Sequence, residues 1–305
     1  MEIIRDLTQF QAEKNMVISI GNFDGVHLGH ASIVRRIVEL AKDRGFESGL
    51  VTFDPHPMRF FGADVDLLQT TEMKAEEFEK LGVDKLFLLS FNKEIASIDP
   101  SVFVREFLIK KMMASFIVVG YDYRFGRNRQ GSYEFLQIMG EKLGFTALRV
   151  SKVVVDGVTA SSTNIRKFLK EGKPETAAKL LGRNYVMRGE VVRGDGLATK
   201  IGFPTANINV QNELIPANGI YSSIVHIDGK QHIGALYIGD RPTVADAGNR
   251  RVEVNVFDFS ENLYGKVIDV EVVNFIRKDS KFSNVDELIK NISEDCKNIR
   301  VLFEK

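Results

Sequence analysis

The sequence predicts two successive domains of different class: an α/β domain with a parallel sheet, then a small antiparallel β-barrel with a terminal helix. Three observations predict this. Short apolar runs alternate with helical patterns from Met16 to about Val155, short β-rich runs follow Tyr185, and one amphipathic segment ends the chain. We place the boundary after residue 182, which gives domains 1–182 and 183–305.

Length and composition bound the function. The 305 residues suffice for two domains, and 41 Lys and Arg balance 41 Asp and Glu, which argues against a nucleic-acid partner held by bulk charge. The single cysteine, Cys296, cannot form an internal disulfide, as in proteins of a reducing cytosol. No signal peptide is visible, and no apolar run approaches the ~20 residues that span a bilayer. We therefore expect a cytoplasmic protein without a membrane partner.

The first domain should contain five strands, each read from a short apolar run. In chain order the runs are Met16–Ile20, Gly49–Phe53, Lys85–Ser90, Phe116–Val119 and Thr146–Val150. Helical spacing between them, as in Val102–Met112, predicts helices on both faces of the sheet. Ligands of such sheets bind beyond the carboxyl ends of the strands, so the segments that follow the strands are the candidate site.

The decapeptide Gly21–His30, GNFDGVHLGH, links the first strand to the first helix. Its three glycines allow a close approach of backbone to ligand, and a helix N-terminus suits phosphate. His27 and His30 are three residues apart, so both imidazoles could donate to a phosphoryl transition state without being nucleophiles.

Three further motifs carry polar or aromatic side chains. In Thr52–Pro57, Asp54 and His56 could contact substrate or only form a rigid turn. The segment Val118–Arg127 combines aromatic rings with arginines, which could stack on a heterocycle and bind phosphate, or form a solvated loop. In Ser161–Arg166, helix capping alone would explain the hydroxyls.

The second domain should contain five strands and a helix. Asp228-Gly229 between two of the strands predicts a hairpin turn, and the helix Val285–Phe303 should cover the barrel. The strands are Val186–Val192, Ile220–Ile227, Gln231–Ile238, Val252–Phe259 and Val267–Phe275.

The chemistry of the second domain centres on Gly202–Asn207, GFPTAN. Thr205 and Asn207 are two apart, so in extended chain they face the same way and offer the oxygen ligands that Mg²⁺ accepts beside nucleotide phosphates. From chemistry alone, a Pro-Thr turn is favoured over a metal site. Glu253 alone would be read as an exposed strand carboxylate.

Together these motifs resemble those of the prokaryotic bifunctional riboflavin kinase/FAD synthetase family, over about residues 16–300. The decapeptide, TFDPHP, VGYDYRFG and SSTNIR match in the first half, and GFPTAN, GDRPT, LYGK and FIRK in the second. The resemblance implies a Rossmann-like nucleotidyltransferase domain that adenylylates FMN to FAD, and a barrel that phosphorylates riboflavin to FMN. It also implies ATP as co-substrate, Mg²⁺ as cofactor, and a possible homo-oligomer.

The resemblance assigns roles residue by residue. Glu253 falls on the family's catalytic glutamate, the expected general base, and His27 and His30 are the other catalytic residues. The remaining assignments are nucleotide or phosphate binding by Gly21, Phe23, Gly25, Gly29, Ser162, Thr163, Arg166, Gly194, Gly196 and Lys200, flavin binding by Asp54, His56, Asp122, Tyr123, Phe125 and Arg277, and metal binding by Thr205 and Asn207.

Two departures from the family pattern lie in the second half. Leu197–Lys200 replaces the usual Arg-Gly-Arg-Thr/Lys, and Asn255 replaces the histidine two residues after the glutamate. These departures keep two alternatives open. The chain could be an FMN adenylyltransferase whose second domain binds flavin or nucleotide without turnover, or a non-enzymatic flavin-binding protein.

Overall fold

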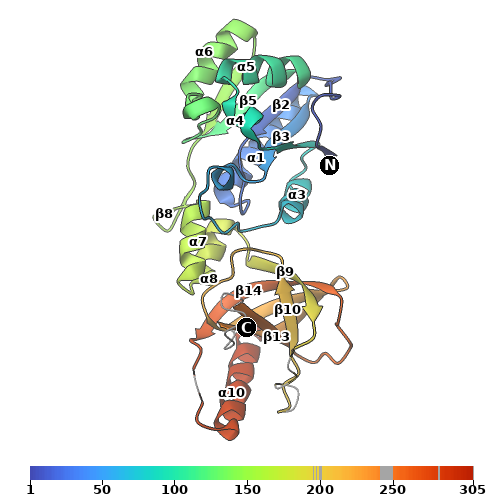
Figure 1. The fold of residues 1–305 in the computed structure, drawn as a ribbon, viewed down its shortest axis with the longest axis vertical. Coiled ribbons are helices and arrows are strands. Elements are labelled where there is room, and N and C mark those ends of the chain that lie inside the picture. The colour runs from blue at the N-terminus through green and yellow to red at the C-terminus, as the bar shows by residue number, and fades with distance from the viewer. Residues whose placement is uncertain (195, 197, 199–200, 241–249, 281, 305) are drawn as a thin grey trace. The chain divides into compact units, whose positions relative to one another are not determined.

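In a computed structural model, the chain forms two compact units, Met1–Ser161 and Ser162–Lys305 (Figure 1). The structure describes residues 1–305 except 195, 197, 199–200, 241–249, 281 and 305. Within the described residues, no helix combines the length and apolar character that crossing a bilayer requires.

The first unit is built on a six-stranded sheet in which every pairing is parallel. The strand order is β1-β4-β3-β2-β5-β6. The strands are β1 Glu2–Ile4, β2 Met16–Ile20, β3 Glu47–Asp54, β4 Lys85–Ser90, β5 Ala114–Gly120 and β6 Thr146–Val150. The predicted strands are therefore confirmed within a few residues. β1 was not predicted, because three residues are too few to show a pattern.

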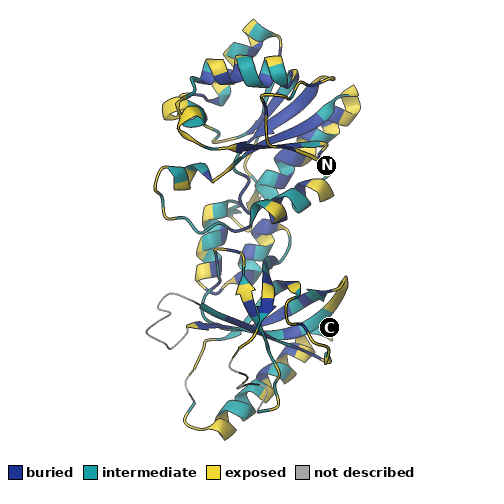
Figure 2. Cartoon of the chain, turned by 45° about the vertical axis from the view of Figure 1, so that its right-hand side comes forward, coloured by how far each residue is buried: buried dark blue, intermediate teal, exposed yellow. Residues whose placement is uncertain are grey.

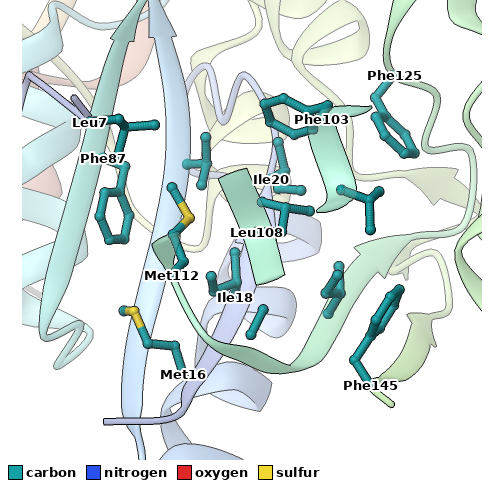
Figure 3. Packing of buried hydrophobic residues seen from close by; sticks show 14 of the residues in the cluster. Leu7, Met16, Ile18, Ile20, Phe87, Phe103, Leu108, Met112, Phe125 and Phe145 are labelled. Carbon is teal, nitrogen blue, oxygen red and sulfur yellow. The ribbon is translucent and has the colours of Figure 1, made fainter. Parts of the chain in front are cut away.

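Helices cover both faces of this sheet, which explains why the central strand β2 is buried along its whole length. Along β2, Ile18 and Ile20 belong to one buried cluster, whereas Val17 belongs to the other. The first cluster, shown in Figure 3, includes residues of η1 and α6; the second includes residues of α1 and α3. The helices of this unit are α1 Leu28–Arg44, α2 Pro57–Phe60, α3 Thr71–Lys80, α4 Lys93–Ser97, α5 Pro100–Val102, the π-helix η1 Phe103–Lys111, the 3₁₀ turn η2 Arg127–Arg129 and α6 Tyr133–Leu143.

The strand order reverses at β2. The chain runs from β2 through β3 to β4 on one side, and continues with β5 and β6 on the other. The segments that follow β2, β3 and β5 therefore emerge side by side at one edge of the sheet, at the topological switch point where such folds bind ligands. The short hairpin β7 Val154–Val155 and β8 Val158–Thr159 closes this unit.

The second unit is a closed antiparallel barrel with the strand order β10-β13-β12-β11-β14-β9. Asp228 and Gly229 form the tight turn between β11 and β12, both with positive φ, as predicted. The strands are β9 Tyr185–Val192, β10 Ala206–Val210, β11 Gly219–Ile227, β12 Lys230–Asp240, β13 Arg250–Val256 and β14 Val267–Arg277. β10 was not predicted as a strand, although its first two residues, Ala206 and Asn207, end the GFPTAN motif that was read as extended chain.

Three helices pack on the barrel: α7 Ser162–Lys170, α8 Pro174–Leu181 and α10 Val285–Phe303. The Glu175 carboxylate of α8 accepts a hydrogen bond from the backbone N–H of Phe275 on β14 at 2.8 Å. Arg300 of α10 forms an ion pair of 2.7 Å with Asp258. Each of these helices carries both buried and exposed residues (Figure 2). The division between the two compact units lies between Ser161 and Ser162, directly before α7. The domain boundary after residue 182 stays a prediction.

Candidate active sites

The turn between β2 and α1 brings both predicted histidines together. His27 is the N-cap of α1, and its Nδ1 accepts a hydrogen bond from the backbone N–H of His30 at 3.3 Å. The two rings stack with centroids 3.6 Å apart and an interplanar angle of 21°. Because Nδ1 of His27 is an acceptor, the proton of its neutral ring lies on Nε2, which can donate to a ligand.

The backbone of this turn is strained. Phe23 has a φ of +50° and Val26 a φ of +38°, in the left-handed region that β-branched and bulky residues avoid. At Gly25, with a φ of +84°, a Cβ would lie 2.6 Å from a side-chain carbon of Leu68. At Gly29, a Cβ would lie 3.1 Å from the imidazole of the N-cap histidine. These two glycines therefore permit the close packing that defines the turn.

The Phe23 side chain packs against the His30 ring. Its ring is 2% exposed and meets the His30 ring edge to face, with centroids 5.3 Å apart. It meets Phe78 of α3 in the same manner at 5.6 Å, and a Cβ on Gly21 would lie 3.1 Å from the Phe23 ring. The structure thus places Phe23 as a packing residue of the turn.

The environment of His30 favours its neutral form. Burial is the largest cause that holds the pKa of His30 well below its usual value of 6.5, and electrostatic interactions with His27 and Lys74 lower it further. Its Nδ1 atom is buried and has no hydrogen-bond partner within the described residues. A neutral imidazole with an unused nitrogen can act as a hydrogen-bonding group toward a ligand.

A segment that sequence reasoning missed packs against this turn. The Asp24 carboxylate accepts a hydrogen bond from the backbone N–H of Leu68 at 3.0 Å. A few residues later, Nζ of Lys74 lies 3.5 Å from the carbonyl oxygen of Asn22. About fifty residues separate these partners in the sequence, so no local pattern could have paired them.

The end of β3 carries the next two predicted residues. His56 is buried and caps α2, with Nδ1 accepting from the backbone N–H of Met58 at 3.2 Å. Asp54 is exposed and accepts a hydrogen bond from the Thr71 hydroxyl at 3.4 Å. His56 therefore has a structural role in addition to any contact with substrate, while Asp54 faces solvent at the candidate edge.

An aromatic cluster beside this turn was also missed. Phe91 meets Phe53, Phe60 and Phe61 edge to face, with centroid distances of 5.3, 5.3 and 5.9 Å. The Phe61 side chain is 70% exposed. Exposed rings on such a platform can stack on a planar heterocycle.

The predicted flavin-binding residues of the loop after β5 differ in their exposure to solvent. Phe125 is buried in the core cluster of Figure 3, and Tyr123 stacks on it at 5.4 Å. Burial raises the pKa of Tyr123, whose hydroxyl has no hydrogen-bond partner among the described residues. Asp122 is exposed. Of the three residues, Asp122 is therefore the most exposed, whereas Tyr123 is partly buried.

The SSTNIR motif opens α7, in the second compact unit. Ser162 and Thr163 are the first residues of this helix, and Arg166 lies one turn later. Thr163 is exposed, and Ser162 and Arg166 are partly exposed.

In the barrel, three polar side chains form a row across neighbouring strands. Glu253 of β13 lies opposite Asn207 of β10 on one side and opposite Tyr237 of β12 on the other. Residues directly opposite in antiparallel strands share a face, so the three side chains project together. Glu253 is 7% exposed, and burial raises the pKa of Tyr237 to about 12.

Hydrogen bonds fix the strand that carries Glu253. Nε of Arg251 donates to Oε1 of Glu253 at 2.6 Å, and Nδ2 of Asn255 donates to the carbonyl oxygen of Pro204 at 2.6 Å. Asn255, read above as a departure from the family, thus ties β13 to the GFPTAN motif. The consequence is a defined position for the motif beside Glu253.

Two predicted glycines precede that motif. A Cβ on Gly194 would collide with Nδ2 of Asn207, so a larger residue there would displace that side chain. Gly196 has a φ of +67°. Lys200, together with 197, 199 and the 241–243 part of the GDRPT motif, lies outside the described residues.

Arg277 at the end of β14 is held by the terminal helix. Its Nη2 and Nε atoms contact the buried Asp295 carboxylate, at 2.7 Å to Oδ2 and 2.9 Å to Oδ1. The cation also lies 5.7 Å from the ring centroid of Phe282. The structure therefore places Arg277 in a structural ion pair.

The donor set around Asn207 suits a metal ion that arrives with its nucleotide. Thr205 and Asn207 offer neutral oxygens only, and no cluster of three or more His, Cys, Asp and Glu that could hold a metal occurs in the described parts of the chain. Mg²⁺ commonly keeps such a shell, with phosphates supplying the negative charge.

The comparisons with known proteins agree with this two-part organisation. The FAD synthetase family matches residues 9–164, and the riboflavin kinase family matches residues 181–303. A Listeria monocytogenes protein described as a bifunctional riboflavin kinase/FMN adenylyltransferase is 34% identical over 300 residues, covering 95% of this chain and 93% of that protein. A Pseudomonas fluorescens protein of the same description is also 34% identical, covering 99% of this chain and 98% of that protein.

A solved structure from Streptococcus pneumoniae, described as a macrolide-efflux protein, is 29% identical, has a TM-score of 0.89, and covers 98% of each chain. The two family matches together cover both halves of the chain, and the two relatives match along nearly all of it. The chain belongs to the family of bifunctional riboflavin kinases/FMN adenylyltransferases.

Proposed function

We propose that this chain makes both flavin cofactors from riboflavin. The barrel transfers the γ-phosphoryl group of ATP to the 5′-hydroxyl of riboflavin, which gives FMN and ADP. The first domain then transfers AMP from a second ATP to the FMN phosphate, which gives FAD and pyrophosphate. One observation carries the proposal: each half matches its own enzyme family and holds its own cluster of candidate catalytic side chains.

In adenylyl transfer, an oxygen of the FMN phosphate attacks the α-phosphorus of ATP while the bond to the β-phosphate oxygen breaks. The nucleophile is already ionised, so the protein need supply only positioning and charge stabilisation. His27 can donate from Nε2, and the stacked geometry places His30 beside it. Ser162, Thr163 and Arg166 stay assigned to ATP phosphates by the family resemblance.

In the kinase reaction, Glu253 takes the proton of the ribityl hydroxyl as that oxygen attacks the γ-phosphorus. Mg²⁺ would be held by Thr205 and Asn207 with the nucleotide, and would neutralise charge on the phosphoryl oxygens. The row of Asn207 and Glu253 on adjacent strands supports this division of roles. Asn255 keeps the metal-binding motif in place through Pro204.

For the flavin, we propose Asp54 and Asp122 as the accessible contacts of the first domain, with the aromatic platform around Phe61 as a stacking surface. Tyr123 and Phe125 support the loop that presents Asp122, and His56 supports the turn after Asp54. Arg277 shapes the barrel end through its pair with the terminal helix. A cytoplasmic location and a homo-oligomer stay predictions.

The test is chromatography of flavins after incubation of the purified chain with MgATP and either riboflavin or FMN. We expect FMN and FAD from riboflavin, and FAD from FMN. FAD from FMN with riboflavin unchanged would instead favour the adenylyltransferase-only alternative, motivated by the Leu197–Lys200 departure. No product in either tube would refute the enzymatic proposal and leave flavin binding alone.

A further inference from the structure

Lys74 is an unusually placed cation in the first unit. It lies in α3 with only 5% of its surface exposed, although lysine is among the residues least often buried. Its ammonium group has three donors, and its one hydrogen bond within the described residues is the 3.5 Å contact to the Asn22 carbonyl oxygen. None of its contacts in that part of the chain is an ion pair. The fold therefore buries a charge and leaves most of its donors unused.

The surrounding carboxylates do not offset this burial. Burial lowers the pKa of Lys74, and the negative charges of Asp24, Asp54 and Glu72 raise it again by less. Asp24 accepts the backbone N–H of Leu68, and Asp54 accepts the Thr71 hydroxyl. Burying an ammonium without a direct ion-pair partner is unfavourable, because the lost hydration is not replaced by a paired charge.

Lys74 belongs to the same local cluster as the histidine pair. The carbonyl group that it contacts belongs to Asn22, in the decapeptide turn, and its charge acts on His30. His30 in turn has a buried nitrogen without a partner among the described residues. Two side chains with unused hydrogen-bonding capacity, one of them cationic, thus converge on the edge of the sheet where folds of this class bind ligands.

We propose that Lys74 is a phosphate-binding catalytic residue of the adenylyl-transfer site, contacting the triphosphate of ATP on the group that becomes pyrophosphate. This inference rests on the proposed function of the first domain. Charge grows on the pyrophosphate oxygens as the bond between the α-phosphorus and its bridging oxygen breaks. A desolvated ammonium acts strongly on that charge, because no water needs to be displaced at the moment of reaction. The FMN phosphate, which loses charge as it attacks, gains less from such a cation.

The experiment compares Lys74→Met with Lys74→Arg and with Lys80→Met. Lys80 is the matched control, since it lies on the same helix with its side chain 69% exposed and paired to Glu77. Three quantities are measured in each full-length variant: kcat/KM for ATP and for FMN in FAD synthesis, KM for pyrophosphate in the reverse reaction, and FMN synthesis from riboflavin. The melting temperature is recorded in parallel.

For Lys74→Met we expect kcat/KM for ATP to fall about 10²-fold or more, the scale of losing one transition-state donor. KM for pyrophosphate should rise, KM for FMN should stay near that of the wild type, and FMN synthesis should be unchanged. Lys74→Arg should restore part of the loss, and Lys80→Met should behave as wild type. The melting temperature of Lys74→Met should not fall, because an uncompensated buried charge is removed.

Two results would overturn the inference. One is a kcat/KM for ATP within twofold of wild type in Lys74→Met. The other is a lower melting temperature with loss of both activities and no rescue by arginine, which would make Lys74 structural. If the wild-type chain makes no FAD at all, the proposed function fails by itself. Calorimetric titration of wild type and Lys74→Met with MgATP and with pyrophosphate would still decide the role of Lys74: equal affinities would contradict it, and weaker binding by the variant would support it.

Discussion

Arg251 and Glu253 form an ion pair on one strand of the barrel, with Nε of Arg251 2.6 Å from Oε1 of Glu253. The Glu253 side chain is 9% exposed and that of Arg251 is 25% exposed. The pair occupies one carboxylate oxygen and leaves the other for a second partner. In the proposed kinase reaction that partner is the ribityl hydroxyl, so the arginine orients the base.

The first prediction concerns Arg251→Gln. Leaving a buried carboxylate oxygen without its donor costs about 1–3 kcal/mol, and a misoriented base loses a comparable amount in the transition state. We expect kcat of FMN synthesis to fall about tenfold or more. FAD synthesis from supplied FMN should be unaffected, and Arg251→Lys should retain part of the kinase rate. A variant whose kinase kcat rises would show instead that the pair restrains the base.

A second prediction separates the base from the fold. Glu253→Gln keeps the size of the side chain but removes its ability to take a proton, so FMN formation from riboflavin should be abolished. FAD formation from FMN should continue at the wild-type rate, because the adenylyl-transfer residues are unchanged. Flavin chromatography of the two reactions in parallel measures both. Loss of both activities would point to misfolding, and retention of both would remove Glu253 from the mechanism.

A third prediction is a variant that loses FAD synthesis and keeps kinase activity. In His30→Ala, one group of the stacked pair is lost, and FAD formation should fall ~10²-fold or more. Kinase activity should remain intact, which gives an internal control for folding and protein concentration. Equal loss of both activities would refute separate catalytic sites. Initial rates of FAD synthesis from FMN and of FMN synthesis from riboflavin decide between these outcomes.

Local patterns predicted most of the architecture. The strands Met16–Ile20 and Lys85–Ser90 and the helix Val285–Phe303 have the predicted bounds, because each is marked by unbroken apolar runs or helical spacing. The strand order could only be inferred from the class of fold. The edge strand Glu2–Ile4 was missed, since its alignment beside β4 depends on distant residues that no window of sequence contains.

The site was predictable where its residues lie in one turn. His27 and His30 are neighbours in sequence and are found stacked. Lys74 gave no signal, because a lysine in an amphipathic helix is normally read as part of the solvent face, and its burial depends on packing against a turn some fifty residues earlier. Asn255 was read as a departure that weakens the kinase, yet its hydrogen bond to Pro204 gives the asparagine a structural role.

The last prediction uses the buried histidine as a pH probe of the first domain. The pKa of His30 in the folded chain lies well below 6.5, whereas in the unfolded chain it should be close to that ordinary value. Between these two values the unfolded chain binds one proton more than the folded chain. The free energy of unfolding must therefore fall as the pH drops through about 6.5 toward the folded pKa, by up to about 1.4 kcal/mol per pH unit.

His30→Gln removes the titrating group and keeps a polar side chain of similar size. Calorimetric melting of the first unit at about pH 7.5 and about pH 5.5 should show a larger loss of stability in the wild type than in this variant. The barrel serves as the reference, since His30 does not belong to it. Identical acid dependence of the first unit in both proteins would mean that His30 takes up its proton as readily in the folded chain as in the unfolded one. The neutral imidazole assigned to adenylyl transfer would then have to be replaced by a cationic one.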